Sequence, residues 1–257
     1  MTVSTSVQKW WDKPPLRWIL TWLRMFRLLI MMIIISTFIV LFKIPIVGKI
    51  LLKFSRKLAP QGCGNLNVRA TVSALRESFW PLVYDAWSGE APLGRKVPDT
   101  DLYDTSSKSI VKLLSFQKSG RPLVLNFGSC TSPPFMAKLA EFKEIARDFA
   151  DVADFITIYI VEAHASDGLS IEDFSDIDHH KTLADRVEAS DRLRSDDMPC
   201  PVLVDPMDDQ NSKIFVTVPE RLYIVYRSTI VYRGSYGPFN YKPKDVKNWL
   251  QKFKNEM

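Results

Sequence analysis

Residues 121–135 read RPLVLNFGSCTSPPF, and this stretch decides the fold class. The run RPLVLNF at 121–127 is almost entirely apolar, which is typical of a strand buried on both faces. The turn GSCTSPP follows at 128–134, with two prolines placed where the first turn of a helix tolerates them. The stretch therefore predicts a buried strand, a tight turn and the start of a helix.

The residues downstream extend this pattern to a second strand. Apolar side chains recur at helical spacing through residues 135–149, and DFITIYIV at 154–161 is a second buried run. Strand, helix and strand in succession predict a βαβ unit with a parallel core. PVLVD at 201–205 predicts a short third strand.

A hairpin and a helix are predicted to close the domain. Residues 221–226 and 229–233 are two strand-like runs around Arg227 and Ser228, and residues 244–254 carry an apolar face at helical spacing. A βαβ unit followed by a ββα unit is the order of a thioredoxin-like fold, including its peroxiredoxin-like members. The predicted fold class is therefore α/β and thioredoxin-like.

The most hydrophobic stretch lies near the N-terminus, at residues 28–42, LLIMMIIISTFIVLF. Extended over 27–47, with Arg27 and Lys43 as charged ends, it is long enough to cross a bilayer core of about 30 Å. We expect an uncleaved single transmembrane helix. A cleaved signal peptide is the alternative, but no small-x-small cleavage site follows. Basic residues flank the run almost equally on both sides, so charge predicts no orientation.

Three parts are predicted along the chain: an arm with the anchor (1–60), a connecting region (61–98) and the thioredoxin-like domain (99–257). The net charge of +5 belongs to the arm, which holds ten of the 34 Lys and Arg residues but one of the 29 acidic residues. The remainder has 24 basic and 28 acidic residues. A whole-domain phosphate-binding face is therefore not expected, and we predict no nucleic-acid partner.

Cysteine and histidine spacing predicts neither a disulfide framework nor a metal site. Cys63, Cys130 and Cys200 are odd in number and far apart, and the three histidines lack the spacing of a zinc site. The turn at 128–134 is more suggestive, because a helix N-terminus stabilises an anion through its dipole and its free N–H groups. A thiolate or selenolate in this turn is expected to have a lowered pKa.

Five motifs then occur in a distinctive order: NFGSCTSPPF (126–135), YIVEAH (159–164), SDG (166–168), HKTLADR (180–186) and PERLYIV (219–225). Together they resemble the iodothyronine deiodinases, membrane-anchored selenoenzymes of thyroid-hormone metabolism. The resemblance runs from about Arg121 to Trp249. It implies reductive removal of iodine from thyroxine-type iodothyronines, with a thiol cosubstrate and no bound cofactor. It also implies a homodimer and a single-pass protein of the endoplasmic reticulum or plasma membrane.

The central departure from the family is at position 132, where the family has selenocysteine and this chain has Ser132; a smaller one is Leu169, where the family usually has tryptophan after Asp-Gly. A serine hydroxyl is a poor nucleophile without a base, and oxygen lacks the oxidised intermediates open to sulfur and selenium. Three explanations stay open: Ser132 stands in for selenocysteine, it is an engineered exchange, or the protein is a natural inactive homologue.

The resemblance implies a catalytic group around position 132, which would be the nucleophile that takes the iodine. Ser129, Tyr159, Glu162 and His164 match family residues that surround this site and carry a hydrogen-bonded proton path, and His164 is also close to substrate. The predicted fold agrees, because the end of the second strand lies beside the end of the first in a βαβ sheet.

Four further residues receive roles from the resemblance. His164 is joined by His180 and Arg221 as substrate-binding residues, with Arg221 a suitable partner for the carboxylate of the hormone. Cys130 and Cys200 match candidates for relaying electrons from the thiol donor.

Two other functions are alternatives. A membrane-tethered peroxiredoxin-like thiol peroxidase is one, although GSCT lacks a threonine three residues before a nucleophilic cysteine. The other is a catalytically silent protein that retains the hormone pocket.

Overall fold

The computed structural model describes residues 93–168, 174–235, 237–238 and 240–256, with seven helical positions between 22 and 37. The described residues from 93 onward belong to one compact unit. Among the described residues, no helix combines the length and the apolar character needed to cross a membrane. Most of the anchor predicted at 27–47 lies outside this set.

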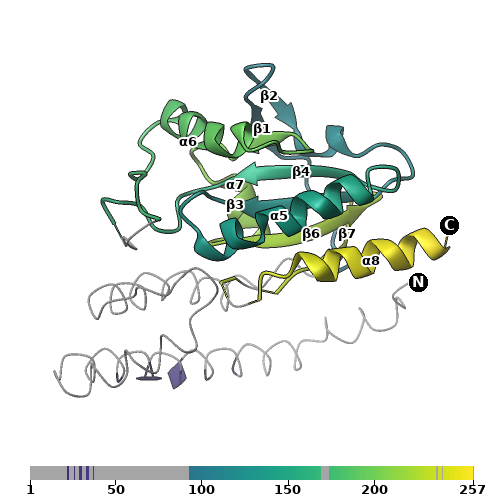
Figure 1. Ribbon diagram of the computed structural model, residues 1–257. Coiled ribbons are helices and arrows are strands. Elements are labelled where there is room, and N and C mark those ends of the chain that lie inside the picture. The colour runs from purple at the N-terminus through teal and green to yellow at the C-terminus, as the bar shows by residue number, and fades with distance from the viewer. Residues whose placement is uncertain are drawn as a thin grey trace. The chain divides into compact units, whose positions relative to one another are not determined.

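A seven-stranded mixed sheet forms the centre of the described domain, in the order β2-β1-β5-β4-β3-β6-β7 (Figure 1). The strands are β1 (Asp101–Asp104), β2 (Ser109–Lys112), β3 (Leu123–Gly128), β4 (Asp154–Tyr159), β5 (Val202–Val204), β6 (Arg221–Tyr226) and β7 (Thr229–Arg233). β3 is parallel to β4, and β4 to β5, whereas β6 runs antiparallel to both β3 and β7. Because β3 and β4 are both central, their apolar runs are buried on both faces.

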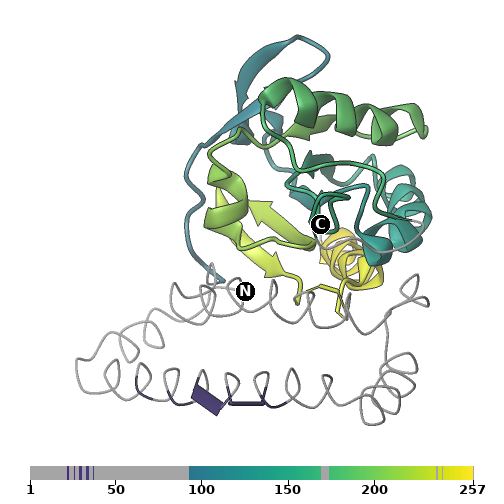
Figure 2. The same ribbon diagram turned by 90° about the vertical axis from the view of Figure 1, so that its left-hand side faces the viewer.

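The helices are η1 (Leu113–Phe116), α5 (Pro133–Asp148), α6 (Leu183–Ser195), α7 (Gln210–Phe215) and α8 (Pro243–Glu256). The apolar side chains of α5, α6 and α8 pack in one core cluster, and those of η1 and α7 in another. Figure 2 shows α8 beside α5 on one side of the sheet and α7 on the other.

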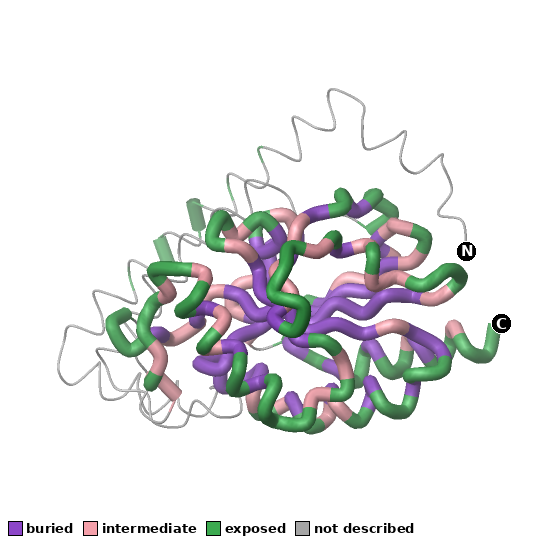
Figure 3. Tube along the Cα trace, turned by 90° about the horizontal axis from the view of Figure 1, so that it is seen from above, coloured by how far each residue is buried: buried purple, intermediate pink, exposed green. Residues whose placement is uncertain are grey.

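The two core clusters follow from strand alternation, because successive side chains point to opposite faces of a sheet. On β3, Val124 faces α5, whereas Leu123, Leu125 and Phe127 face the opposite cluster. Buried residues accordingly concentrate along the central strands (Figure 3).

This topology confirms the predicted thioredoxin-like order. β3-α5-β4 is the predicted βαβ unit, and β6-β7-α8 is the predicted ββα unit. Five elements lie outside the prediction: β1, β2, η1, α6 and α7. The chain joins the sheet at Lys96, which bridges to Thr229, a few residues before the predicted domain start at 99.

The turn between β3 and α5 depends on a glycine at its first position. A Cβ on Gly128 would lie 2.2 Å from the ring of Phe135, so no larger residue fits while that ring packs against the strand end. The ring of Phe135 also lies 5.9 Å from that of Tyr241. Close packing here fixes residue 132 at the first turn of α5.

Candidate active site

Ser132 is the N-cap residue of α5 and is buried, with 1% of its surface exposed. Its hydroxyl does not cap its own helix. Instead, Ser132 Oγ donates a hydrogen bond to Glu220 Oε2 at 2.5 Å. The backbone N–H of Ser132 donates to Ser129 O at 3.2 Å. The side chain at position 132 therefore points at a buried carboxyl group.

Glu220 is fully buried at the start of β6, beside the end of β3. Burial raises its pKa to about 7, although the hydrogen bond from Ser132 acts in the opposite direction. Among the described residues, no donor or acceptor pairs with its second oxygen, Oε1. A Cβ on Gly237 would come within 1.9 Å of that oxygen, so the 237–238 turn closes tightly over it. Near neutral pH, Glu220 can therefore carry a transferable proton next to position 132.

Glu162 is a second buried carboxyl group, and it receives several donors. The N–H and hydroxyl of Thr131 both donate to Glu162 Oε2, at 3.2 and 2.6 Å. The Tyr159 hydroxyl donates to Oε1. His180 Nε2 lies 3.1 Å from the same oxygen, at ion-pair distance but without hydrogen-bond alignment. Glu162 thus joins the active-site turn to β4 and to the loop before α6.

The environment of Glu162 favours its ionised form. Burial acts to raise the pKa of Glu162, but contacts with His180, Thr131 and Tyr159 outweigh it and leave the pKa lowered. Burial and the negative charge of Glu162 raise the pKa of Tyr159, which stays a neutral donor. The Tyr159 oxygen also accepts from the N–H of Cys130 at 3.3 Å. Two carboxyl groups with opposite pKa shifts are the usual mark of separate acid and acceptor roles.

The structure brings the other predicted catalytic residues to this turn. Ser129 is buried, and its hydroxyl oxygen accepts from the N–H of Ala163 at 3.1 Å. His164 is partly buried, and its N–H donates to Thr131 Oγ1 at 3.1 Å. Both residues fix the loop after β4 against the turn after β3.

Two of the predicted substrate-binding residues have buried side chains. Only 1% of the His180 side chain is exposed. Arg221 is equally buried; its guanidinium donates to Gly234 O at 2.8 Å and Val216 O at 3.1 Å. In this arrangement both side chains support the site from within, and His164 is the more accessible of the three.

The helix N-terminus supplies fewer anion donors than its position suggests. Pro133 and Pro134 occupy the first two helical positions, and proline has no N–H. The N–H of Met136 is used by Ser132 O at 3.0 Å. The expected stabilisation of an anion at position 132 therefore rests on the helix dipole more than on free N–H groups.

The two described cysteines lie in different places. Cys130 is two residues from position 132, and burial raises the pKa of its thiol to about 12. Cys200 precedes β5, and its sulfur lies 3.6 Å from Thr157 Oγ1; burial raises its pKa to about 11. Cys200 is level with the start of β4, whereas position 132 follows the end of β3. Of these two cysteines, Cys130 lies in the turn at 128–134, with its sulfur 3.9 Å from Ala189 O on α6.

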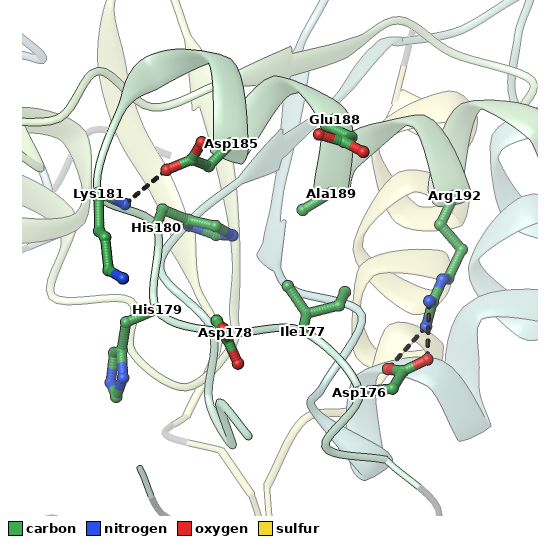
Figure 4. A pocket seen from close by; sticks show the side chains of 10 residues that line it. All are labelled: Asp176, Ile177, Asp178, His179, His180, Lys181, Asp185, Glu188, Ala189 and Arg192. Atoms are coloured by element: carbon green, nitrogen blue, oxygen red, sulfur yellow. Dashed lines mark hydrogen bonds and ion pairs between the residues drawn. The ribbon is translucent and has the colours of Figure 1, made fainter. Parts of the chain in front are cut away.

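A cavity of about 550 Å³ lies between residues 176–181 and helix α6 (Figure 4). Arg192 and Asp176 form an ion pair on one side of it, and the N–H of Lys181 bonds to Asp185 on the other. His180 lines the cavity, so the cavity borders the buried contacts that Glu162 makes with His180, Thr131 and Tyr159. Among the residues that the structure describes, no group of three or more His, Cys, Asp or Glu side chains is arranged to hold a metal ion.

Three residues of this site were not predicted: Glu220, Thr131 and Arg186. Glu220 had a usable signal, because the predicted strand that begins at Arg221 pairs with β3 and places the residue before it near the turn. Thr131 and Arg186 had none, because their roles depend on contacts with Glu162 and His180 across the fold.

Comparison with known proteins gives a family match over most of the chain. The model of the iodothyronine deiodinase family matches residues 19–254. The chain is 39% identical over 168 residues to a thyroxine 5-deiodinase of Gallus gallus, a match that covers 65% of each chain and so a little under two thirds of that relative. It is 41% identical to a type I iodothyronine deiodinase of Xenopus laevis, over 69% of each chain.

Similar solved structures have low sequence identity. An uncharacterised conserved protein of Geobacillus kaustophilus is 18% identical, with a TM-score of 0.49 over 63% of this chain and 82% of that one. A thioredoxin-like protein of Porphyromonas gingivalis is 16% identical, with a TM-score of 0.45 over 62% and 92%. The family assignment rests on the match over residues 19–254 and on the identities of the curated relatives. This chain belongs to the iodothyronine deiodinase family.

Proposed function

We propose that this protein removes iodine reductively from iodothyronines when position 132 carries selenocysteine or cysteine, with a thiol as cosubstrate. The relatives named thyroxine 5-deiodinase and type I iodothyronine deiodinase support the substrate class. The observation that carries the proposal is the buried side chain at 132, in contact with a carboxyl group whose pKa is about 7.

The reaction needs both a nucleophile and a proton. The chalcogenolate at position 132 attacks iodine, so the carbon–iodine bond breaks and a chalcogen–iodine bond forms. The bonding electron pair stays on the ring carbon, which takes up a proton. One thiol then displaces iodide and forms a mixed disulfide with cysteine, or a selenenyl sulfide with selenocysteine; a second thiol cleaves this bond, releases the disulfide and restores position 132. In sum, two thiols become one disulfide, and iodine on the ring is replaced by hydrogen.

Glu220 is the group best placed to supply that proton. Its pKa of about 7 lets the carboxyl hold a proton near neutral pH, and none of the described residues hydrogen-bonds to Oε1. Glu162 has the opposite role: its lowered pKa keeps it ionised, and it holds Thr131 and Tyr159 in place. Ser129 and His164 complete the group around the turn.

The positions of the predicted substrate-binding residues and of the two described cysteines bear on substrate contact and electron transfer. His164 is the partly exposed group beside the turn and is the best placed of the three to contact substrate. The buried side chains of His180 and Arg221 would support the pocket wall, and they would contact substrate only if the loops that cover them moved. Of the two described cysteines, Cys130 is nearer to position 132 along the chain, but its sulfur lies 3.9 Å from Ala189 O on α6, so both thiols would need a rearrangement to take part.

The proposal also includes the setting of the enzyme. Residues 27–47 would anchor it by a single pass in the endoplasmic reticulum or plasma membrane, supported by the apolar run there. A homodimer follows from the family resemblance. Ser132 itself favours a second function, a silent hormone-binding homologue, because a hydroxyl cannot complete the redox cycle.

The test uses the full-length chain with Ser132→Cys, thyroxine and excess dithiothreitol. We expect iodide release, little turnover of hydrogen peroxide, and a loss of about 100-fold in iodide release on adding Glu220→Gln. Peroxide turnover without iodide would support the peroxidase alternative instead. Unchanged iodide release in the Glu220→Gln variant would remove Glu220 as the proton donor but leave the nucleophile in place.

A further inference from the structure

Arg186 is a buried cation, with 2% of its surface exposed. It contacts His180, which in turn lies beside Glu162. Its Nη1 donates to Asp205 O at 2.9 Å and Pro206 O at 3.0 Å, and pairs with Asp209 Oδ1 at 2.8 Å. Its Nε donates to His180 Nδ1 at 3.2 Å. The guanidinium is therefore fixed in one orientation, with one N–H aimed at the imidazole.

This contact determines which nitrogen of His180 carries the proton. A guanidinium in a protein stays protonated and offers only donors, so His180 Nδ1 has to be the acceptor. A neutral imidazole that accepts at Nδ1 carries its single proton on Nε2. That nitrogen lies 3.1 Å from Glu162 Oε1.

The opposite tautomer would be unfavourable at both ends of the ring. Its Nδ1–H would meet an N–H of Arg186, and its Nε2 lone pair would meet an oxygen of Glu162. Because both neighbours are buried, these repulsions would be screened weakly. With the proton on Nε2, both contacts are attractive.

We infer that Arg186 is a positioning residue that holds His180 in the tautomer protonated on Nε2, and thereby keeps Glu162 an acceptor for Thr131 and Tyr159. The inference deepens the proposed function, on which it rests. The inference also has a consequence for proton transfer through His180. Because Arg186 occupies Nδ1, His180 cannot take up a proton at that nitrogen and pass it to Glu162.

The direct test is the protonation state of His180 in the unmodified full-length chain. The chain has three histidines, so ¹⁵N-histidine labelling gives three imidazole spectra, which are assigned with His164→Gln and His179→Gln. Long-range ¹H–¹⁵N correlation at neutral pH is expected to show a protonated Nε2 and an unprotonated Nδ1 for His180. A protonated Nδ1, alone or together with Nε2, would overturn the inference.

A variant set separates this role from simple support of the fold. Arg186→Met, made together with Ser132→Cys, is expected to change the His180 nitrogen shifts and lower iodide release at least about 10-fold. The loss should be smaller than the roughly 10⁴-fold loss caused by a wrong tautomer in a histidine that acts directly as the base. Asp209→Asn is the matched control, because it weakens the Nη1 contacts but keeps the Nε donor; its His180 spectrum should match that of the parent chain.

Each other result contradicts the inference. If Arg186→Met lowers iodide release with His180 shifts unchanged, Arg186 acts only through the fold. If the shifts change and iodide release does not, the tautomer has no role in the reaction. Failure of Ser132→Cys to release iodide would count against the proposed function alone, because the tautomer measurement is made on the chain with Ser132.

Discussion

Glu220 and Glu162 are two buried carboxyl groups near one turn, and their surroundings shift their pKa values in opposite directions. Glu162 has three residues that stabilise its charge, through contacts from Thr131, Tyr159 and His180. Glu220 receives one side-chain donor from the part of the chain that the structure describes, the hydroxyl of Ser132. The difference in hydrogen-bond partners, with both groups buried, accounts for the opposite directions.

The raised pKa of Glu220 predicts a pH dependence of stability. Its pKa is about 7 in the folded protein and 4.5 in the unfolded chain. Below about pH 4.5 both states hold the proton, so stability is unaffected. Between the two values only the unfolded state loses it, so the free energy of unfolding falls, by about 3 kcal/mol in total above pH 7.

Urea unfolding of the parent chain and of Glu220→Gln at pH 5 and pH 8 checks this linkage. Glutamine cannot titrate, so the parent chain should lose stability relative to the variant as the pH rises. Equal changes in the two proteins would mean that the pKa of Glu220 is not raised.

At the scale of elements, α6 supports the site from a well-formed N-terminus. Thr182 and Asp185 make a capping box, in which Thr182 Oγ1 accepts from the N–H of Asp185 at 3.2 Å and Asp185 Oδ2 accepts from that of Thr182 at 2.9 Å. The same carboxylate binds the N–H of Lys181. The box therefore anchors both the start of α6 and the residue that follows His180.

Thr182→Ala is expected to cost about 1 kcal/mol of stability, because it leaves an N–H of the first turn without its partner. Thr182→Ser retains the hydroxyl and serves as the control. Thermal unfolding of the three proteins measures the difference. A shift as large in the serine variant as in the alanine variant would show that the cap hydroxyl is not what stabilises α6.

The elements that sequence reasoning identified are those with long apolar patterns. β3, β4 and α5 have continuous or periodic apolar runs, and the fold buries them as predicted. β1 and β2 have four residues each and are largely exposed or partly buried, so they lack such a pattern. α6 buries Arg186, Ser190 and Leu193, and an arginine and a serine carry no apolar periodicity. The buried polar contacts of α6 arise only from the tertiary fold.

The positions of some site residues could likewise be predicted from the sequence, whereas the burial of others could not. Ser129, Tyr159 and Glu162 follow strand ends, and the fold brings them to the turn at 128–134 as the strand order predicts. The burial of His180 and Arg221 was not visible in sequence, because a charged or polar side chain is usually exposed. Only the contacts with Arg186 and with Gly234 O and Val216 O show why these two can be buried.

At the scale of the whole molecule, charge and hydropathy separate along the chain. Residues 1–60 carry the apolar run and most of the excess positive charge, whereas the rest is slightly acidic. The described residues from 93 onward have their own sheet and two core clusters. This part therefore has a sheet and an apolar core of its own.

Removal of residues 1–47 is expected to give a soluble, folded protein. Membrane fractionation with carbonate extraction, followed by circular dichroism of the soluble fraction, measures both properties. Retention of the truncated chain in the membrane pellet would contradict the placement of the anchor.

The central claim is that position 132 is the nucleophile in a pocket that binds iodothyronine. The most direct measurement compares thyroxine binding and single-turnover iodide release in two matched preparations, the chain with Ser132 and its Ser132→Cys variant. Because oxygen and sulfur occupy a similar place at the start of α5, both should bind thyroxine with similar affinity, and only the cysteine form should release iodide. Binding by the Ser132→Cys variant without iodide release would contradict the account, and absence of binding in both would remove the hormone pocket with it.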